Sequence, residues 1–205
     1  MSFSDIFNCY DSFVVSSDKE YKMIKIVVLG TSGVNFINRF KEEEISCFEL
    51  ISICSNKDIL ESSKADKKLF VGDYEFGCGG DIEKGEIFTT RAEKEIKELL
   101  VGGQRLFILA FLGGGLTCGG LPVIAKFAKE LELNPQIIVT LPFSFEGDKR
   151  NEKSFQAIYK TQDYVDDIVM ISNDIILRSI TKQVSMKQAF GVVDELILQK
   201  IKENI

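Results

Sequence analysis

Residues 112 to 150 read LGGGLTCGGLPVIAKFAKELELNPQIIVTLPFSFEGDKR, and this stretch decides the expected fold. A glycine run follows an apolar strand predicted at Leu106 to Leu112, and a helix is expected to open at Pro122, because proline is favoured in a first helical turn. Glu146 and Arg150 stand on the loop after the next predicted strand. Glycine N–H groups can approach an anion closely, and a helix N-terminus adds partial positive charge. The layout is typical of a phosphate-binding loop, with an empty strand-to-helix turn as the alternative.

Apolar runs rich in β-branched residues alternate with helical patterns along the chain. Continuous apolar runs are typical of strands covered on both faces, and their alternation with helices favours a parallel sheet with right-handed crossovers. The predicted strands are Ile24 to Leu29, Phe48 to Cys54, Leu106 to Leu112, Gln136 to Thr140 and Ile168 to Ile171. The predicted helices are Val34 to Glu44, Thr89 to Val101, Pro122 to Leu131, Lys149 to Thr161, Asn173 to Thr181 and a last helix capped by Ser185. The expected fold is a doubly wound, Rossmann-like α/β domain of residues 21–205, preceded by an N-terminal arm of residues 1–20.

Composition excludes several classes of site. With 205 residues, 45% of them hydrophobic, the chain can bury the core of one domain. Its net charge of −6 argues against a nucleic-acid binder, because neutralised phosphates supply most of that affinity. Five scattered cysteines and no histidine argue against a structural metal site or a Ser-His pair. The sequence has no apolar run long enough for a membrane span, so we expect a cytoplasmic protein.

Glycine and polar clusters follow the predicted strands. In an open parallel sheet, ligands bind beyond the carboxyl ends of the strands. The clusters that stand at such ends are 30–35, Ser55 with Asn56, 113–119, 146–150, and Asn173 with Asp174. We therefore expect these clusters to converge on one edge of the sheet.

Two motifs resemble the FtsZ/tubulin family. Gly113-Gly-Gly115, followed by Gly119 and Pro122, is similar to the signature loop of FtsZ, and the stretch from Pro142 to Arg150 resembles the FtsZ loop after the next strand. The resemblance runs from about residue 21 to about residue 200. It implies the nucleotide-binding domain of that family, with GTP or GDP as the cofactor and Mg²⁺ accompanying GTP.

The resemblance also implies which residues hold the phosphates. They are Gly33, Asn35, Gly113, Gly114, Gly115, Thr117 and Gly119. The sequence departs from the family pattern here, because the run from Gly30 to Asn35 is one residue shorter and Thr117 stands at a position that is usually glycine. The loop 77–81 is shortened as well, and these departures predict a weakened γ-phosphate side.

The base and the sugar are assigned to other residues by the same resemblance. Glu146 and Arg150 would lie at the ribose, and Asn173 at the guanine edge. Phe190 would stack on the ring, and Asp194, four residues later on the same helix face, would accept from the guanine N1 and N2 protons. Taken singly, Phe190 could be ordinary core, Asp194 a solvated carboxylate, and Glu146 with Arg150 a surface ion pair of little energetic weight.

Hydrolysis in the family requires an acidic NxDxxD loop, which follows the long last helix and is inserted by a neighbouring subunit. The sequence stops at Ile205 without it, so we expect no catalytic residue, no autonomous GTP hydrolysis and no self-polymerisation. The leading interpretation is an FtsZ-like guanine-nucleotide-binding partner or regulator of a cytoskeletal or cell-division assembly, with a full-length FtsZ-like protein as candidate partner. One alternative is a nucleotide-free pseudo-GTPase scaffold. Another is a small Rossmann-type enzyme with a different cofactor, although residues 30–33 do not form GxGxxG.

Overall fold

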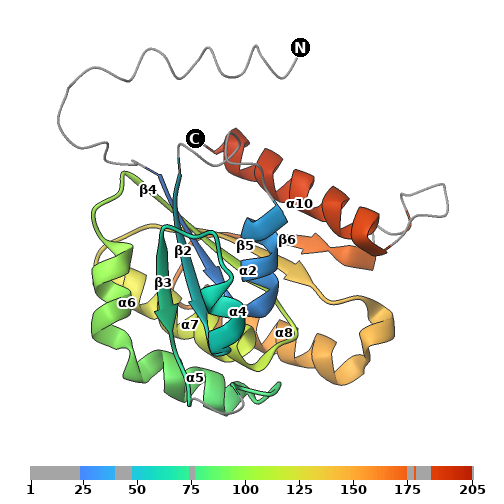
Figure 1. The fold of residues 1–205 in the computed structure, drawn as a ribbon, viewed down its shortest axis with the longest axis horizontal. Coiled ribbons are helices and arrows are strands. Elements are labelled where there is room, and N and C mark those ends of the chain that lie inside the picture. Colours follow the sequence, from blue (N-terminus) through green and yellow to red (C-terminus); the bar gives the residue numbers. More distant parts are fainter. Residues whose placement is uncertain (1–23, 40–47, 74–76, 175–177, 179–185, 205) are drawn as a thin grey trace.

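The computed structural model describes residues 24–39, 48–73, 77–174, 178 and 186–204 (Figure 1). Within these residues, six strands form one parallel sheet in the order β3-β2-β1-β4-β5-β6. The strands are β1 Ile24–Leu29, β2 Phe48–Cys54, β3 Lys67–Phe70, β4 Arg105–Phe111, β5 Gln136–Leu141 and β6 Ile168–Ser172. The order is that of a doubly wound sheet, which confirms the predicted fold class. The predicted arm of residues 1–20 lies outside the described residues.

Helices cover both faces of the sheet. They are α2 Gly30–Arg39, α4 Lys57–Glu61, α5 Ile82–Arg91, α6 Glu93–Leu100, α7 Gly115–Glu130, α8 Asp148–Gln162 and α10 Met186–Glu203, with a 3₁₀ turn η1 at Ser144–Glu146. Side chains of β1 alternate between two cores, as the period of a strand requires. Val27 and Leu29 pack with α5, α6 and α7, whereas Ile26 and Val28 pack with α2 and α10. No helix of the described part is long and apolar enough to cross a membrane.

The structure corrects several predicted boundaries. The expected helix from Thr89 to Val101 is two helices, because the chain leaves helical geometry at Ala92 (φ −93°, ψ 22°) between α5 and α6. The strand β3 and the helix α4 are additions, and both are too short for a periodic apolar pattern to reveal them. The predicted helix from Asn173 to Thr181 and the cap at Ser185 lie largely outside the described residues.

Pro122 does not open a helix. It lies inside α7, which begins seven residues earlier at Gly115. Glycine is a poor helix former, but here α5 packs directly on the α7 backbone and favours it. A Cβ at Gly115 would lie 2.4 Å from the carbonyl oxygen of Asp81, and one at Gly119 would lie 2.1 Å from that of Ile82. The helix therefore begins at the last glycine of the run, Gly115, because only glycine at positions 115 and 119 permits this close helix contact.

Candidate functional site

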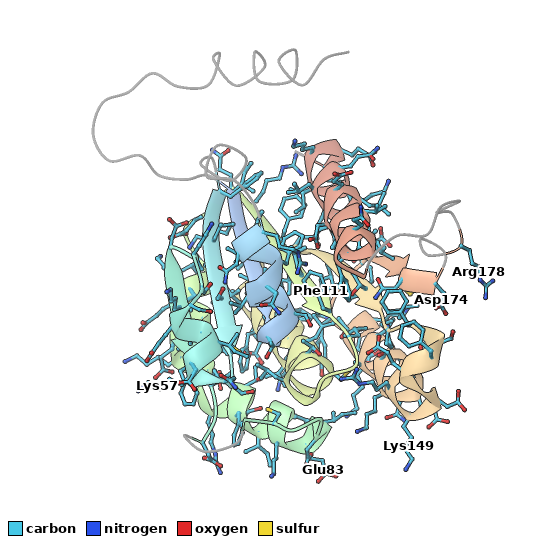
Figure 2. All side chains as sticks on the ribbon, turned by 45° about the vertical axis from the view of Figure 1, so that its right-hand side comes forward. Lys57, Glu83, Phe111, Lys149, Asp174 and Arg178 are labelled. Carbon is cyan, nitrogen blue, oxygen red and sulfur yellow. The ribbon has the colours of Figure 1, made fainter. Side chains whose placement is uncertain are left out.

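The loops that follow the parallel strands meet at one edge of the sheet, as the sequence predicted. A Cβ at Gly30, after β1, would lie 3.0 Å from Cγ2 of Thr117 in α7. Asp174, after β6, accepts hydrogen bonds from the Ser144 N–H at 3.1 Å. Figure 2 labels one residue from each of four segments that follow strands, namely Lys57, Glu83, Lys149 and Asp174.

All twelve predicted site residues lie in the described part of the chain. Their positions are Gly33 and Asn35 in α2, Gly113 and Gly114 before α7, Gly115, Thr117 and Gly119 in α7, Glu146 in η1, Arg150 in α8, Asn173 after β6, and Phe190 and Asp194 in α10. Direct contacts within the set join Gly114 to Thr117, Glu146 to Arg150, and Arg150 to Gly113. The other contacts described below are with residues outside the predicted set.

The glycine loop turns sharply at Gly113, whose φ of +112° favours glycine. Gly114 is the extended N-cap of α7, and the first helical hydrogen bond runs from the Cys118 N–H to the Gly114 carbonyl at 3.0 Å. The peptide N–H groups just before Cys118 therefore have no acceptor inside the helix. Such a helix start offers hydrogen-bond donors and partial positive charge to an anion.

The side chains of Thr117 and Cys118 form hydrogen bonds with the backbone of this loop. Thr117 donates from Oγ1 to the Gly114 carbonyl at 3.0 Å and is buried, so its side chain is turned to the backbone. The Sγ atom of Cys118 accepts from the Gly113 N–H at 3.2 Å. Burial raises the pKa of the Cys118 thiol, so this cysteine is a neutral structural residue of the loop.

Several predicted phosphate residues have a packing role in the structure. Gly115 and Gly119 lie against α5, as described above, and Gly33 lies against β1, where a Cβ would approach Cβ of Val28 to 2.8 Å. Asn35 is exposed on α2. The loop between β1 and α2 is correspondingly short, since α2 begins at Gly30 itself.

Glu146 and Arg150 form an ion pair between η1 and α8. The second carboxylate oxygen of Glu146 accepts from the Phe143 N–H at 2.8 Å, which fixes the turn. Arg150 also lies beside the glycine loop, because a Cβ at Gly113 would be 3.8 Å from its Cδ atom. The ion pair therefore brings the stretch from Pro142 to Arg150 next to the glycine loop at Gly113. An isolated surface ion pair would not connect the two motifs in this way.

The predicted base residues Asn173, Phe190 and Asp194 differ in burial. Asn173 is 7% exposed, and its Oδ1 atom has no hydrogen-bond partner among the described residues. Phe190 is 37% exposed and makes a T-shaped contact with the Phe143 ring, with centroids 5.9 Å apart and an interplanar angle of 69°. The interpretation of Phe190 as ordinary core is therefore wrong.

Asp194 is 4% exposed, so it is not a solvated carboxylate either. Both of its oxygens accept from Arg39, with Nη2 to Oδ1 at 2.8 Å and Nε to Oδ2 as the second bond. Burial raises the pKa of Asp194, and the Arg39 guanidinium opposes that shift. The same guanidinium lies over the Phe190 ring, 6.0 Å from its centroid.

Sequence reasoning missed two cations that lie beside the predicted site residues. Arg39 ends α2 and stands 155 positions before Asp194, so nothing local in the sequence pairs them. Lys153 of α8 donates from Nζ to the Gly80 carbonyl at 2.8 Å and joins α8 to the loop 77–81. Its position three residues after Arg150 places both cations on one helix face, which is the signal that could have identified it.

Comparison with known proteins agrees with this architecture. A sequence model described as Tubulin/FtsZ family, GTPase domain, matches residues 23–181. A solved FtsZ W319Y mutant of M. jannaschii is 32% identical, with a TM-score of 0.78, and the match covers 87% of this chain and 55% of that one. An empty FtsZ dimer of M. jannaschii is 29% identical, with a TM-score of 0.77 and coverages of 98% and 58%.

A more distant structure shares the fold alone. It is CetZ2 from Haloferax volcanii in a GTPγS-bound protofilament, 20% identical, with a TM-score of 0.73 over 87% of this chain and 57% of that one. The chain therefore spans little more than half the length of the proteins it matches. The family match over most of the sequence, together with the sheet order and the loops at its carboxyl edge, shows that this chain belongs to the Tubulin/FtsZ family and comprises its GTPase-domain fold.

Proposed function

We propose that this chain binds GDP or GTP at the carboxyl edge of its sheet, with Mg²⁺ accompanying GTP. The observation that carries the proposal is the buried Oδ1 atom of Asn173, which lacks a partner among the described residues. Leaving a buried polar group unpaired costs about 1–3 kcal/mol. A guanine base supplies N–H donors at its edge, so base binding would satisfy this atom.

The other residues of the edge fit a nucleotide in their chemistry. Gly113, Gly114 and the start of α7 would hold phosphate oxygens through peptide N–H groups, while Thr117 orders that turn from within. Lys153 would add positive charge on the side of the loop 77–81. Glu146 and Arg150 would hold the ribose, and the half-exposed Phe190 ring would stack on the base.

We further infer that a polypeptide of these 205 residues holds the nucleotide without rapid turnover. Hydrolysis needs a group that positions and activates a water molecule. At this edge Asp81 caps α5 through the Lys84 N–H, Glu146 pairs with Arg150, and Asp194 pairs with Arg39. These carboxylates are already engaged, which supports binding rather than catalysis by these residues alone. The role that suits such a protein is that of a partner or regulator of a cytoskeletal or cell-division assembly.

A second candidate is a scaffold that holds no nucleotide. The bidentate Arg39–Asp194 pair favours it, because the carboxylate that would recognise guanine is satisfied by the protein itself.

One experiment separates the two. The protein is purified without added nucleotide and denatured, any released small molecule is chromatographed, and a stripped sample is titrated with GDP by calorimetry. Released GDP or GTP, or saturable GDP binding, supports the proposed function. No released nucleotide and no heat of GDP binding would leave the scaffold, and a released dinucleotide would instead support an enzyme with another cofactor.

A further inference from the structure

Arg39 covers two of the three side chains assigned to the base. Its Nε and Nη2 atoms donate to the two oxygens of Asp194, and its guanidinium lies over the ring of Phe190. It reaches them from α2, whereas both partners belong to α10. The contact therefore bridges two helices on the same face of the sheet.

The donor pattern of this contact matches that of guanine. A guanidinium offers two parallel N–H groups to a carboxylate, and bidentate pairing of this kind is among the strongest hydrogen-bonded arrangements in proteins. The guanine edge also presents two adjacent donors, N1–H and N2–H. Asp194 is only 4% exposed while Arg39 holds it, so little of its surface is open to a second bidentate donor.

We propose that Arg39 is a plug for the base site, holding Asp194 and Phe190 in the position of a guanine base until guanine displaces it. This inference rests on the proposed guanine binding. The pairing also keeps the empty site folded, because a buried carboxylate without a partner is strongly destabilising.

The plug can leave without a rearrangement of the fold. Arg39 is the last residue of α2, and its side chain is 32% exposed, so rotation about its side-chain bonds can bring the guanidinium into water. Asp194 would keep a full set of donors, because guanine would replace the guanidinium. The apparent affinity for guanine then depends on the fraction of molecules in which the plug is open.

The test compares the full chain with Arg39→Ala and Arg39→Gln variants, using GDP and IDP as probes. If the plug is closed about nine-tenths of the time, Arg39→Ala will bind GDP about tenfold more tightly than the unmodified chain. The gain for IDP will be smaller, because its base lacks the 2-amino group and offers Asp194 one donor rather than two. Arg39→Gln, whose neutral amide can still donate to Asp194, will show an intermediate gain.

The melting temperature, measured with and without GDP, provides a second readout. It needs less protein than a titration and so can be measured even if Arg39→Ala yields little folded protein. We expect both variants to melt at a lower temperature than the unmodified chain when empty, and to gain more from GDP than it does. Arg105→Ala is the matched control, since Arg105 is exposed at the amino end of β4, on the opposite edge of the sheet. It should change neither quantity.

The outcomes separate the plug from the function on which it rests. GDP binding by the unmodified chain that is unchanged or weakened in both Arg39 variants would overturn the plug and leave the proposed function standing. GDP binding that appears only in the variants would support a plug that keeps the chain closed. No GDP binding by any of these proteins would overturn both.

Discussion

Lys153 donates a hydrogen bond to the carbonyl oxygen of Gly80, 2.8 Å away, and so ties α8 to the loop that precedes α5. Gly80 belongs to the shortened loop, where the sequence predicts a weakened γ-phosphate side. A lysine at this position can compensate for part of that loss, because its ammonium group brings positive charge to the edge where the phosphates would lie.

Lys153→Met is therefore expected to weaken GTP binding by about 1.5–3 kcal/mol, the range of a hydrogen bond to a charged group. Titration calorimetry at low and high salt measures the change, which should shrink as salt increases. Lys149→Met is the control, since Lys149 is exposed on the same helix. If Lys153→Met and Lys149→Met lose the same affinity for GTP, the effect comes from the net charge of the protein and not from the position of Lys153.

Asp194→Ala is expected to abolish the preference for guanine over adenine. In the unmodified chain a carboxylate that faces adenine loses its donors, which costs about 1.5–3 kcal/mol. Competition between GDP and ADP measures this ratio, and Glu195→Ala, the exposed neighbour on α10, is the control. A guanine preference that survives in Asp194→Ala would remove Asp194 from base recognition.

Glu49 links stability to pH on the opposite edge of the sheet. Burial alone would raise the pKa of Glu49, but its hydrogen bonds with Lys67 and Lys25 and the charges of both lysines outweigh burial and lower it. Lys67 Nζ lies 2.6 Å from Oε1, and Lys25 Nζ lies 3.1 Å from Oε2. Because the folded pKa is lowered, the stabilisation is complete above the unfolded pKa, near 4.3, and is lost as pH falls through the folded pKa.

Glu49→Gln is thus expected to lower the free energy of unfolding at pH 7 by roughly 1–3 kcal/mol. Urea denaturation at a series of pH values should show the two proteins converging below about pH 4. A difference that stays constant from pH 7 to pH 3 would mean that packing, not the charge of Glu49, accounts for it.

Gly119→Ala tests the contact between α5 and α7. The new methyl group would lie 2.1 Å from the Ile82 carbonyl oxygen and 2.6 Å from the Glu86 nitrogen, so backbone must move. We expect a loss of about 3 kcal/mol or more by urea denaturation, at the upper end of overpacking. Gly191→Ala in α10 meets nothing within 4 Å and should be neutral or stabilise the protein by up to about 1 kcal/mol. If both variants unfold alike, the close contact is not present in solution.

Assembly offers a further prediction for the 205-residue polypeptide. A head-to-tail filament needs two different faces on each subunit, and these 205 residues form the GTPase-domain fold, little more than half the length of the FtsZ structures that the chain matches. We expect no pelletable polymer with GTP, and slower assembly of a full-length FtsZ when the polypeptide is added below stoichiometry. Filaments of the polypeptide by itself would contradict the first expectation, and unaltered FtsZ assembly would contradict the second.

The sequence predicts the fold well because its central strands are fully buried. Continuous apolar runs such as Ile26 to Leu29 are typical of strands that helices cover on both faces, and they indicated the parallel sheet. The strand β3 escaped prediction because it has four residues, two of them exposed lysines. Pro122 misled the prediction of α7 because the contact that stabilises a helical glycine run comes from α5, which is remote in sequence.

Part of the candidate site could also be predicted from the sequence, and part could not. The residues of the two motifs lie close in sequence, so their meeting at Gly113 and Arg150 could be anticipated. The partner of Asp194 could not, because a bidentate pair between α2 and α10 depends on how two helices pack on one face of the sheet. Tertiary contacts of this kind leave no periodic or local trace in the sequence.

The α5–α7 contact also bears on how this family can change over time. Gly115 and Gly119 are required by the approach of two helix backbones, whether or not a phosphate is ever bound beside them. A descendant that bound no nucleotide would still keep these glycines because it has to fold, whereas Asn173, whose buried Oδ1 atom has no partner among the described residues, would be free to change. The glycine signature should therefore persist longer than the nucleotide binding that it is used to identify, and the residues proposed to contact the base are the better guide to which members still bind a ligand.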